Sequence, residues 1–83
     1  MHEHGLMTRL LRRAQDEADA RGARLRGIDA RLGALYGADE AHFRHEFEHV
    51  CEELALGALQ LSVEVDANRP TGVELVRVHL EDH

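Results

Sequence analysis

The chain has 83 residues, of which 43% are hydrophobic and 31% are charged, and its 16 acidic and 10 basic residues give a formal net charge of −6. This length allows one domain, residues 1–83, with a modest core. The acidic balance argues against nucleic-acid binding, which needs a basic stripe, and no apolar run approaches the roughly 20 residues of a membrane-spanning helix. We therefore expect a cytoplasmic protein.

The chain contains one cysteine but seven histidines. Cys51 is the only cysteine, so an internal disulfide and a cysteine-built zinc site are both excluded. Its place beside an apolar stripe predicts an inert, half-buried thiol. Histidine occurs seven times, at positions 2, 4, 42, 45, 49, 79 and 83. No nucleophile with its base emerges from these residues, so we do not expect an enzyme.

The first expected element is an amphipathic helix over residues 3–21. Its apolar residues recur at steps of three and four: Leu6, Met7, Leu10, Leu11, Ala14 and Ala18. Gly22 is well placed to end this helix. A half-buried strand should follow over 28–32, where apolar and charged residues alternate. The segment 33–37 then turns the chain.

A second helix is expected to begin near Asp39 and to run to about Leu54. Its buried side would carry Phe43, Phe47, Val50 and Leu54. Alternating patterns predict strands over 59–65 and over 76–80, where Val76, Val78 and Leu80 should form the buried face. The turn-rich segment 66–72 should join these two strands as a hairpin. The expected fold is α+β, helix-strand-helix-strand-strand, with two helices packed on a three-stranded sheet.

The sharpest chemical feature is that His2 directly follows Met1. A large second residue normally prevents removal of the first methionine, so the free amine should lie next to the imidazole. The Met1 amine and the amide and imidazole nitrogens of His2 can close small chelate rings around one ion, and Glu3 could complete the set. Planar nitrogen and oxygen donors favour Ni(II) or Cu(II) over zinc. The alternative is an uninvolved terminus.

Three short motifs in this order of elements carry a family resemblance. They are Met1-His2-Glu3, Arg31-Leu-Gly-Ala-Leu-Tyr-Gly37 and Phe47-Glu48. At this spacing the chain resembles the HypA/HybF family of nickel-insertion metallochaperones for hydrogenase and urease. The resemblance implies that residues 1–3 bind nickel and that Asp39 belongs to the same site. A plain helix cap is the alternative for Asp39.

The resemblance fails at one place. HypA proteins carry a zinc domain with two Cys-x-x-Cys pairs between their last two strands, where this chain has only residues 66–72. We therefore expect no structural zinc. The partners that the resemblance implies are a HypB-type GTPase and the apo subunit of a nickel enzyme.

The other histidines leave alternatives open. Three of them share one face of the second expected helix, at spacings of three and four: His42, His45 and His49. This face could hold a second metal ion, or it could be a solvated surface or a dimer contact. His4 could supplement the terminal chelate or be an exposed helix residue, whereas His79 and His83 are expected to be uninvolved.

Two functions from different classes follow. The first is a Ni(II)-binding accessory protein for a nickel enzyme, with hydrogenase maturation as the leading process and urease maturation as the next. The second is a protein-interaction module on the HypA scaffold, forming a homodimer through the histidine-bearing helix or a sheet edge, with metal binding incidental.

Overall fold

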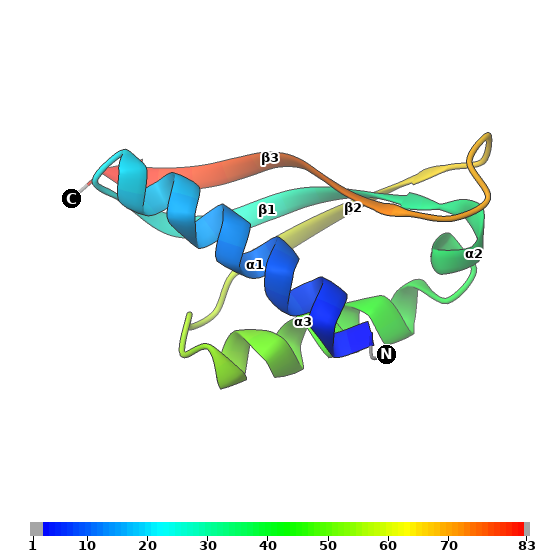
Figure 1. The fold of residues 1–83 in the computed structure, drawn as a ribbon, viewed down its shortest axis with the longest axis horizontal. Helices are drawn as coiled ribbons and strands as arrows, with labels where there is room; N and C mark the ends of the chain where they lie inside the picture. Colours follow the sequence, from blue (N-terminus) through cyan, green and yellow to red (C-terminus); the bar gives the residue numbers. More distant parts are fainter. Residues whose placement is uncertain (1–2, 83) are drawn as a thin grey trace.

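The computed structural model describes residues 3–82, without the side chains of Glu3 and His4. It is an α+β fold (Figure 1), and its elements follow the expected order. They are α1 (Glu3–Ala20), β1 (Ala23–Gly33), α2 (Ala34–Gly37), α3 (Glu40–Glu53), β2 (Gln60–Asp66) and β3 (Val73–Asp82). Gly22 follows α1 with a φ of 63°, as expected for the residue that ends a helix. The segment expected to be a simple turn contains the one-turn helix α2.

The sheet has β1 at its centre, with β2 parallel to it on one side and β3 antiparallel on the other. The expected hairpin between the last two strands is therefore wrong. Strands that flank a third strand lie about 10 Å apart, so residues 67–72 cross the end of β1 instead of making a tight turn. Alternating apolar and polar residues are compatible with both arrangements, because the pattern reports the buried face of a strand and not its neighbour.

The crossing segment also holds α2 in place. Three backbone N–H groups, those of Gly33, Ala34 and Leu35, donate to the carbonyl oxygens of Gly72, Arg69 and Pro70 at 2.8, 2.7 and 3.0 Å. The first N–H groups of a helix have no acceptor within the helix itself. Because the crossing segment supplies these acceptors, it fixes the start of α2 against the end of the sheet.

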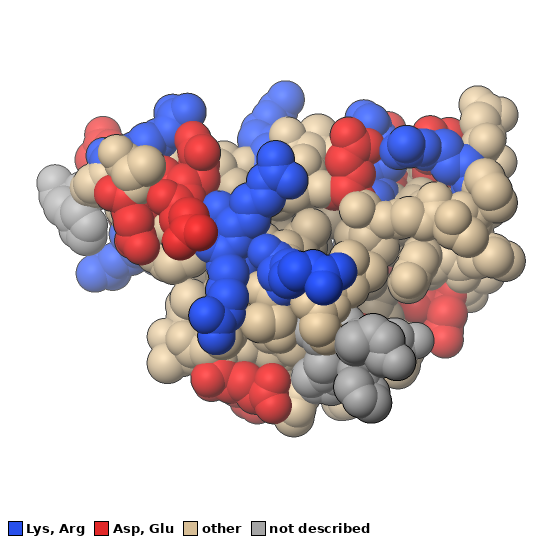
Figure 2. All heavy atoms as spheres, in the orientation of Figure 1, with Lys and Arg blue, Asp and Glu red and all other residues tan. Residues whose placement is uncertain are grey.

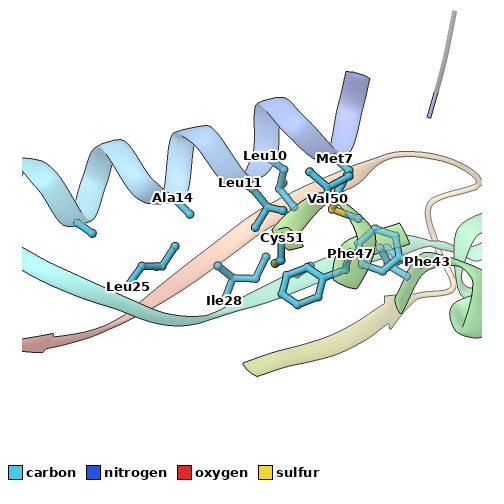
Figure 3. Close-up of a cluster of buried hydrophobic side chains, with 13 residues drawn as sticks. Met7, Leu10, Leu11, Ala14, Leu25, Ile28, Phe43, Phe47, Val50 and Cys51 are labelled. Atoms are coloured by element: carbon cyan, nitrogen blue, oxygen red, sulfur yellow. The ribbon is translucent and has the colours of Figure 1, made fainter. Parts of the chain in front are cut away.

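The core lies between the sheet and the helices α1 and α3. The stripe expected for the first helix is buried except at Leu6, which is half-buried, and Ala14 and Ala18 are at 0% exposure. Such small side chains let a helix approach a sheet closely. In the core (Figure 3), Met7 and Leu10 of α1 lie near side chains from the other long helix. Those from α3 are Phe43, Phe47, Val50 and Cys51.

Two irregularities make β1 and β3 differ from the expected strands. The pairing shifts between Leu25 and Gly27, so Leu25 and Ile28 both lie in the core although they are three residues apart. A second shift, opposite Asp29 and Ala30, leaves Val76 at 41% exposure. The expectation that Val76 faces inward with Val78 is therefore wrong. A bulge inserts one residue and reverses the alternation beyond it.

The other face of the sheet is polar. Arg31 on β1 lies 3.7 Å from Glu64 on β2 and 3.4 Å from Glu74 on β3, so one guanidinium group links all three strands. Such exposed ion pairs contribute little to stability, about 0–1 kcal/mol each. None of the helices within residues 3–82 has both the length and the apolar character that crossing a bilayer requires.

Candidate functional site

The described start of α1 lies beside α3. Met1 and His2, expected as metal ligands, fall outside the described residues, as does His83. Glu3 and His4 lie in the first turn of α1, and their side chains are not described. One turn further on, Leu6 and Met7 line a narrow crevice together with Glu46 of α3. The first turn of α1 therefore adjoins the first half of α3.

An open pocket of about 340 Å³ lies next to this crevice. Its apolar part is formed by α2, α3 and the crossing segment: Leu35, Tyr36, Phe43 and Thr71. Besides the phenol of Tyr36, its titratable side chains come from the N-cap and the first half of α3: Asp39, His42 and Glu46. Because Tyr36, Phe43 and Glu46 also line the crevice, the pocket and the start of α1 share one wall.

Asp39 occupies the N-cap position of α3 but does not cap the helix through its side chain. Its backbone has φ −129° and ψ 55°, and its carboxylate makes no capping hydrogen bond. The plain-cap interpretation requires that bond. The carboxylate is exposed and lines the pocket instead. Asp39 is thus placed where a nearby cation could use it.

The three histidines of α3 fall into different surroundings. His42 lines the pocket, whereas His45 is exposed and His49 lies 3.4 Å from Glu53. Among the side chains that the structure describes, those of residues 5–82, no three from His, Cys, Asp or Glu form a group that could hold a metal ion. The shared face expected for these histidines is therefore not a three-ligand site by itself.

Sequence reasoning missed Glu46 as a candidate. The signal was present in the sequence, because Asp39, His42 and Glu46 follow one another at steps of three and four and so fall on one stripe of a helix. Attention to histidine alone grouped His42 with His45 and His49.

The surroundings of two other reactive side chains, Cys51 and His79, indicate structural roles. Cys51 is 4% exposed, and its burial, with a smaller contribution from Glu48, raises the pKa of its thiol to about 11. The thiol is therefore protonated at neutral pH, as expected of an inert cysteine. His79 lies on the polar face of the sheet, where its Nε2 is 2.8 Å from a carboxylate oxygen of Asp29.

Arginines and acidic residues lie in different parts of the exposed side of α1. Arg9, Arg12 and Arg13 lie in the middle of the helix, whereas Asp16, Glu17 and Asp19 lie near its end, and Figure 2 shows basic side chains gathered over this helix. A helix dipole favours acids at the start and bases at the end. The acidic residues in the last turn of α1 are therefore unfavourable for the helix, whereas the three arginines lie too far from either end for the dipole to act on them strongly.

The resemblance to HypA stays a prediction from the sequence motifs. The pocket adds a carboxylate beside the start of α1, which a terminal metal site could use. Comparisons of the chain with protein-family models, with curated proteins and with solved structures find no match.

Proposed function

We propose that this chain is a nickel-binding accessory protein that delivers Ni(II) to a nickel enzyme, with hydrogenase as the leading client and urease as the next. The observation that carries the proposal is the position of the Asp39 carboxylate in a pocket that adjoins the start of α1. In this proposal, donors from the chain terminus and the carboxylate at the N-cap of α3 bind the same ion.

Simple chain geometry supports this reach. A helix rises about 1.5 Å per residue, so Glu3 lies about 5–6 Å along the axis from Leu6 and Met7, which line the crevice with Glu46. Each residue beyond the helix can span at most about 3.6 Å. We propose that the Met1 amine and the His2 imidazole reach the pocket that Asp39 lines.

The donor chemistry suits a cargo ion. An amine, an imidazole and carboxylates form a nitrogen and oxygen set of the kind that Ni(II) and Cu(II) accept in planar or tetragonal geometry. All of these donors must lose protons to bind, so affinity depends on pH. An ion held near the surface by such groups can be bound firmly at neutral pH and still be released to a client.

Delivery requires contact with partners, which for a HypA-type protein are a HypB-type GTPase and the apo enzyme. We propose the arginine patch of α1, formed by Arg9, Arg12 and Arg13, as the docking face for an acidic surface of the client. Replacing all three by Gln should reduce binding to the apo large subunit of a nickel hydrogenase and leave nickel affinity unchanged. Surface plasmon resonance and calorimetry measure the two effects. Unchanged client binding would exclude this face.

The nickel proposal is tested by titrating untagged protein that begins at Met1. Placing one glycine before Met1, or replacing His2 by Ala, should weaken Ni(II) binding at least about tenfold, because each change removes or displaces a chelating nitrogen. The affinity of the unaltered chain should also fall as the pH is lowered through the range where the α-amine and imidazole titrate, about 8 to 6. Isothermal titration calorimetry measures both effects.

A matched control replaces His79 by Gln, because this histidine lies on the opposite face of the sheet beside Asp29. Its nickel affinity should equal that of the unaltered chain. If the extended chain and His2→Ala also keep full affinity, the nickel proposal is wrong. The interaction module then becomes the better account, since β2 and β3 each form an edge of the sheet in the described part of the chain and could pair with a second copy.

A further inference from the structure

We propose that the groove between α1 and the start of β3 binds an extended segment of a partner protein, in which one apolar residue lies between two acidic residues. The groove has a volume of about 480 Å³, within the range of pockets that bind ligands, about 300–1,000 Å³. This inference rests on the docking face that the proposed function gives to α1, and it specifies the chemistry of the segment that docks there.

Apolar and basic side chains both line this groove. The apolar side chains come from both elements: Leu6, Leu10, Val73 and Leu75. Leu10 is buried, but the other three are half-buried, so part of this apolar surface is open to solvent. The basic side chains are Arg9 and Arg13 of α1, and both are exposed. The groove can therefore hold an apolar side chain beside charged ones.

The helix brings its four groove residues to one side, because Leu6, Arg9, Leu10 and Arg13 follow one another at helical spacing. The strand on the other side of the groove, β3, pairs only with β1 in the described part of the chain. Its second edge is therefore free to hydrogen-bond with an extended segment.

The two arginines of the groove are not neutralised by acids of the chain. Among the side chains of residues 5–82, neither Arg9 nor Arg13 forms an ion pair. The acid one turn beyond Arg13 is Glu17, and its carboxylate lies 2.8 Å from the Nε of Arg21 instead. Exposed positive charges without a partner attract an acidic segment.

One acid, Glu74, is among the described residues that line the groove, and its charge is compensated. Its carboxylate oxygen lies 3.4 Å from a guanidinium nitrogen of Arg31 and 3.2 Å from one of Arg69. Glu74 therefore repels an acidic segment less than a free carboxylate would. The positive charge of Arg9 and Arg13 dominates the groove.

The spacing of the two arginines matches an extended segment. Four residues of a helix rise about 6 Å, which separates Arg9 from Arg13 along α1. In an extended segment, residues i and i+2 lie about 6.6 Å apart on one side, and the residue between them points to the other side. Two acids at this spacing can meet the two arginines while the apolar residue between them enters the groove.

The experiment measures binding of a fluorescein-labelled peptide, Ser-Glu-Leu-Glu-Ser, to the full chain by fluorescence anisotropy, with a chelator present so that no nickel is bound. Arg9→Gln and Arg13→Gln should each weaken binding about threefold to fivefold, as expected for the loss of an exposed charge pair. Arg12→Gln is the matched control and should change the affinity less than about twofold. Arg12 is exposed on the same helix but does not line the groove.

The peptide itself tests the apolar contact. Replacing its leucine by alanine should weaken binding at least about fivefold, because less apolar surface is then buried in the groove. Amide chemical shifts of the chain should change mainly at residues 6–13 and 73–75 when the leucine peptide is added. Equal binding of the two peptides would show that the groove is not used.

Two further outcomes would overturn the inference. One is no binding of the leucine peptide at chain concentrations up to about 1 mM. The other is an equal loss of affinity in Arg12→Gln and Arg9→Gln, which would indicate diffuse attraction to the surface of α1. The nickel proposal is tested separately, because the peptide titration contains no metal. If the peptide binds as expected but does not compete with the apo large subunit of a nickel hydrogenase, the groove stands and the client docks elsewhere.

Discussion

Replacing Gly33 by alanine is expected to lower the free energy of unfolding by about 3 kcal/mol. A Cβ at Gly33 would lie 2.5 Å from both the carbonyl carbon and the carbonyl oxygen of Thr71. Both are backbone atoms of the crossing segment, so no side chain can rotate away to relieve the contact. Moving the segment would also stretch the hydrogen bond from the Gly33 N–H to the Gly72 carbonyl, now 2.8 Å. Urea unfolding measures the loss.

The matched control is Gly22→Ala. Gly22 has a φ of 63° but nothing within 4 Å of a Cβ built there, so the same substitution should cost only the backbone strain, about 1–2 kcal/mol. Gly33 has φ −68°, which any residue adopts, so its cost comes from the contact alone. If the Gly33 variant unfolds at the same urea concentration as the unaltered chain, the segment does not cross β1 as described.

The Gly33→Ala variant also tests the pocket that Asp39 and Thr71 line. Thr71 and α2 form its apolar part, and the crossing segment supplies the acceptors for the first N–H groups of α2. Displacement of that segment should therefore disturb the pocket and weaken nickel binding through the position of Asp39.

The second large effect is expected at Phe47. Phe47→Ala should cost about 3–5 kcal/mol, because it removes a large side chain from a close-packed core and leaves a cavity. Phe47 is 3% exposed and belongs to the same buried cluster as Ile28 and Cys51. A domain of this size has a total free energy of unfolding of about 4–12 kcal/mol. The variant should therefore unfold at a far lower urea concentration than the unaltered chain.

Leu35→Ala provides the contrast for Phe47. Leu35 is a large apolar residue of α2, but it is 67% exposed. Its truncation should change the free energy of unfolding by no more than about 0.5 kcal/mol. Equal losses for the two substitutions would contradict the assignment of α3's buried side.

Much of the fold could be predicted from local patterns. The two long helices were predictable because α1 and α3 repeat apolar residues at helical spacing, and Gly22 marked the end of α1. The strands were harder. The shift between Leu25 and Gly27 breaks the alternation of β1, so only its second half was recognised. The register shift at Val76 likewise reverses the alternation of β3, so the prediction that Val76 faces inward is wrong.

For the candidate site too, some features could be read from the sequence and others depend on tertiary packing. The spacing of Asp39, His42 and Glu46 is written in the sequence, as is the Met-His terminus. Whether these two sets share one corner of the molecule depends on the packing of α1 against α3 beside α2. Contacts between residues far apart in the chain leave no periodic signal.

The sequence by itself determined the class of the fold, the order of its elements and which side of each helix is buried, because burial imposes a period that the side chains must follow. Only the tertiary structure decided that β1 lies between β2 and β3, that residues 67–72 cross its end, and that the first half of α3 faces the start of α1. Those features depend on which surfaces meet, and many pairings of buried faces are compatible with the same pattern along the chain.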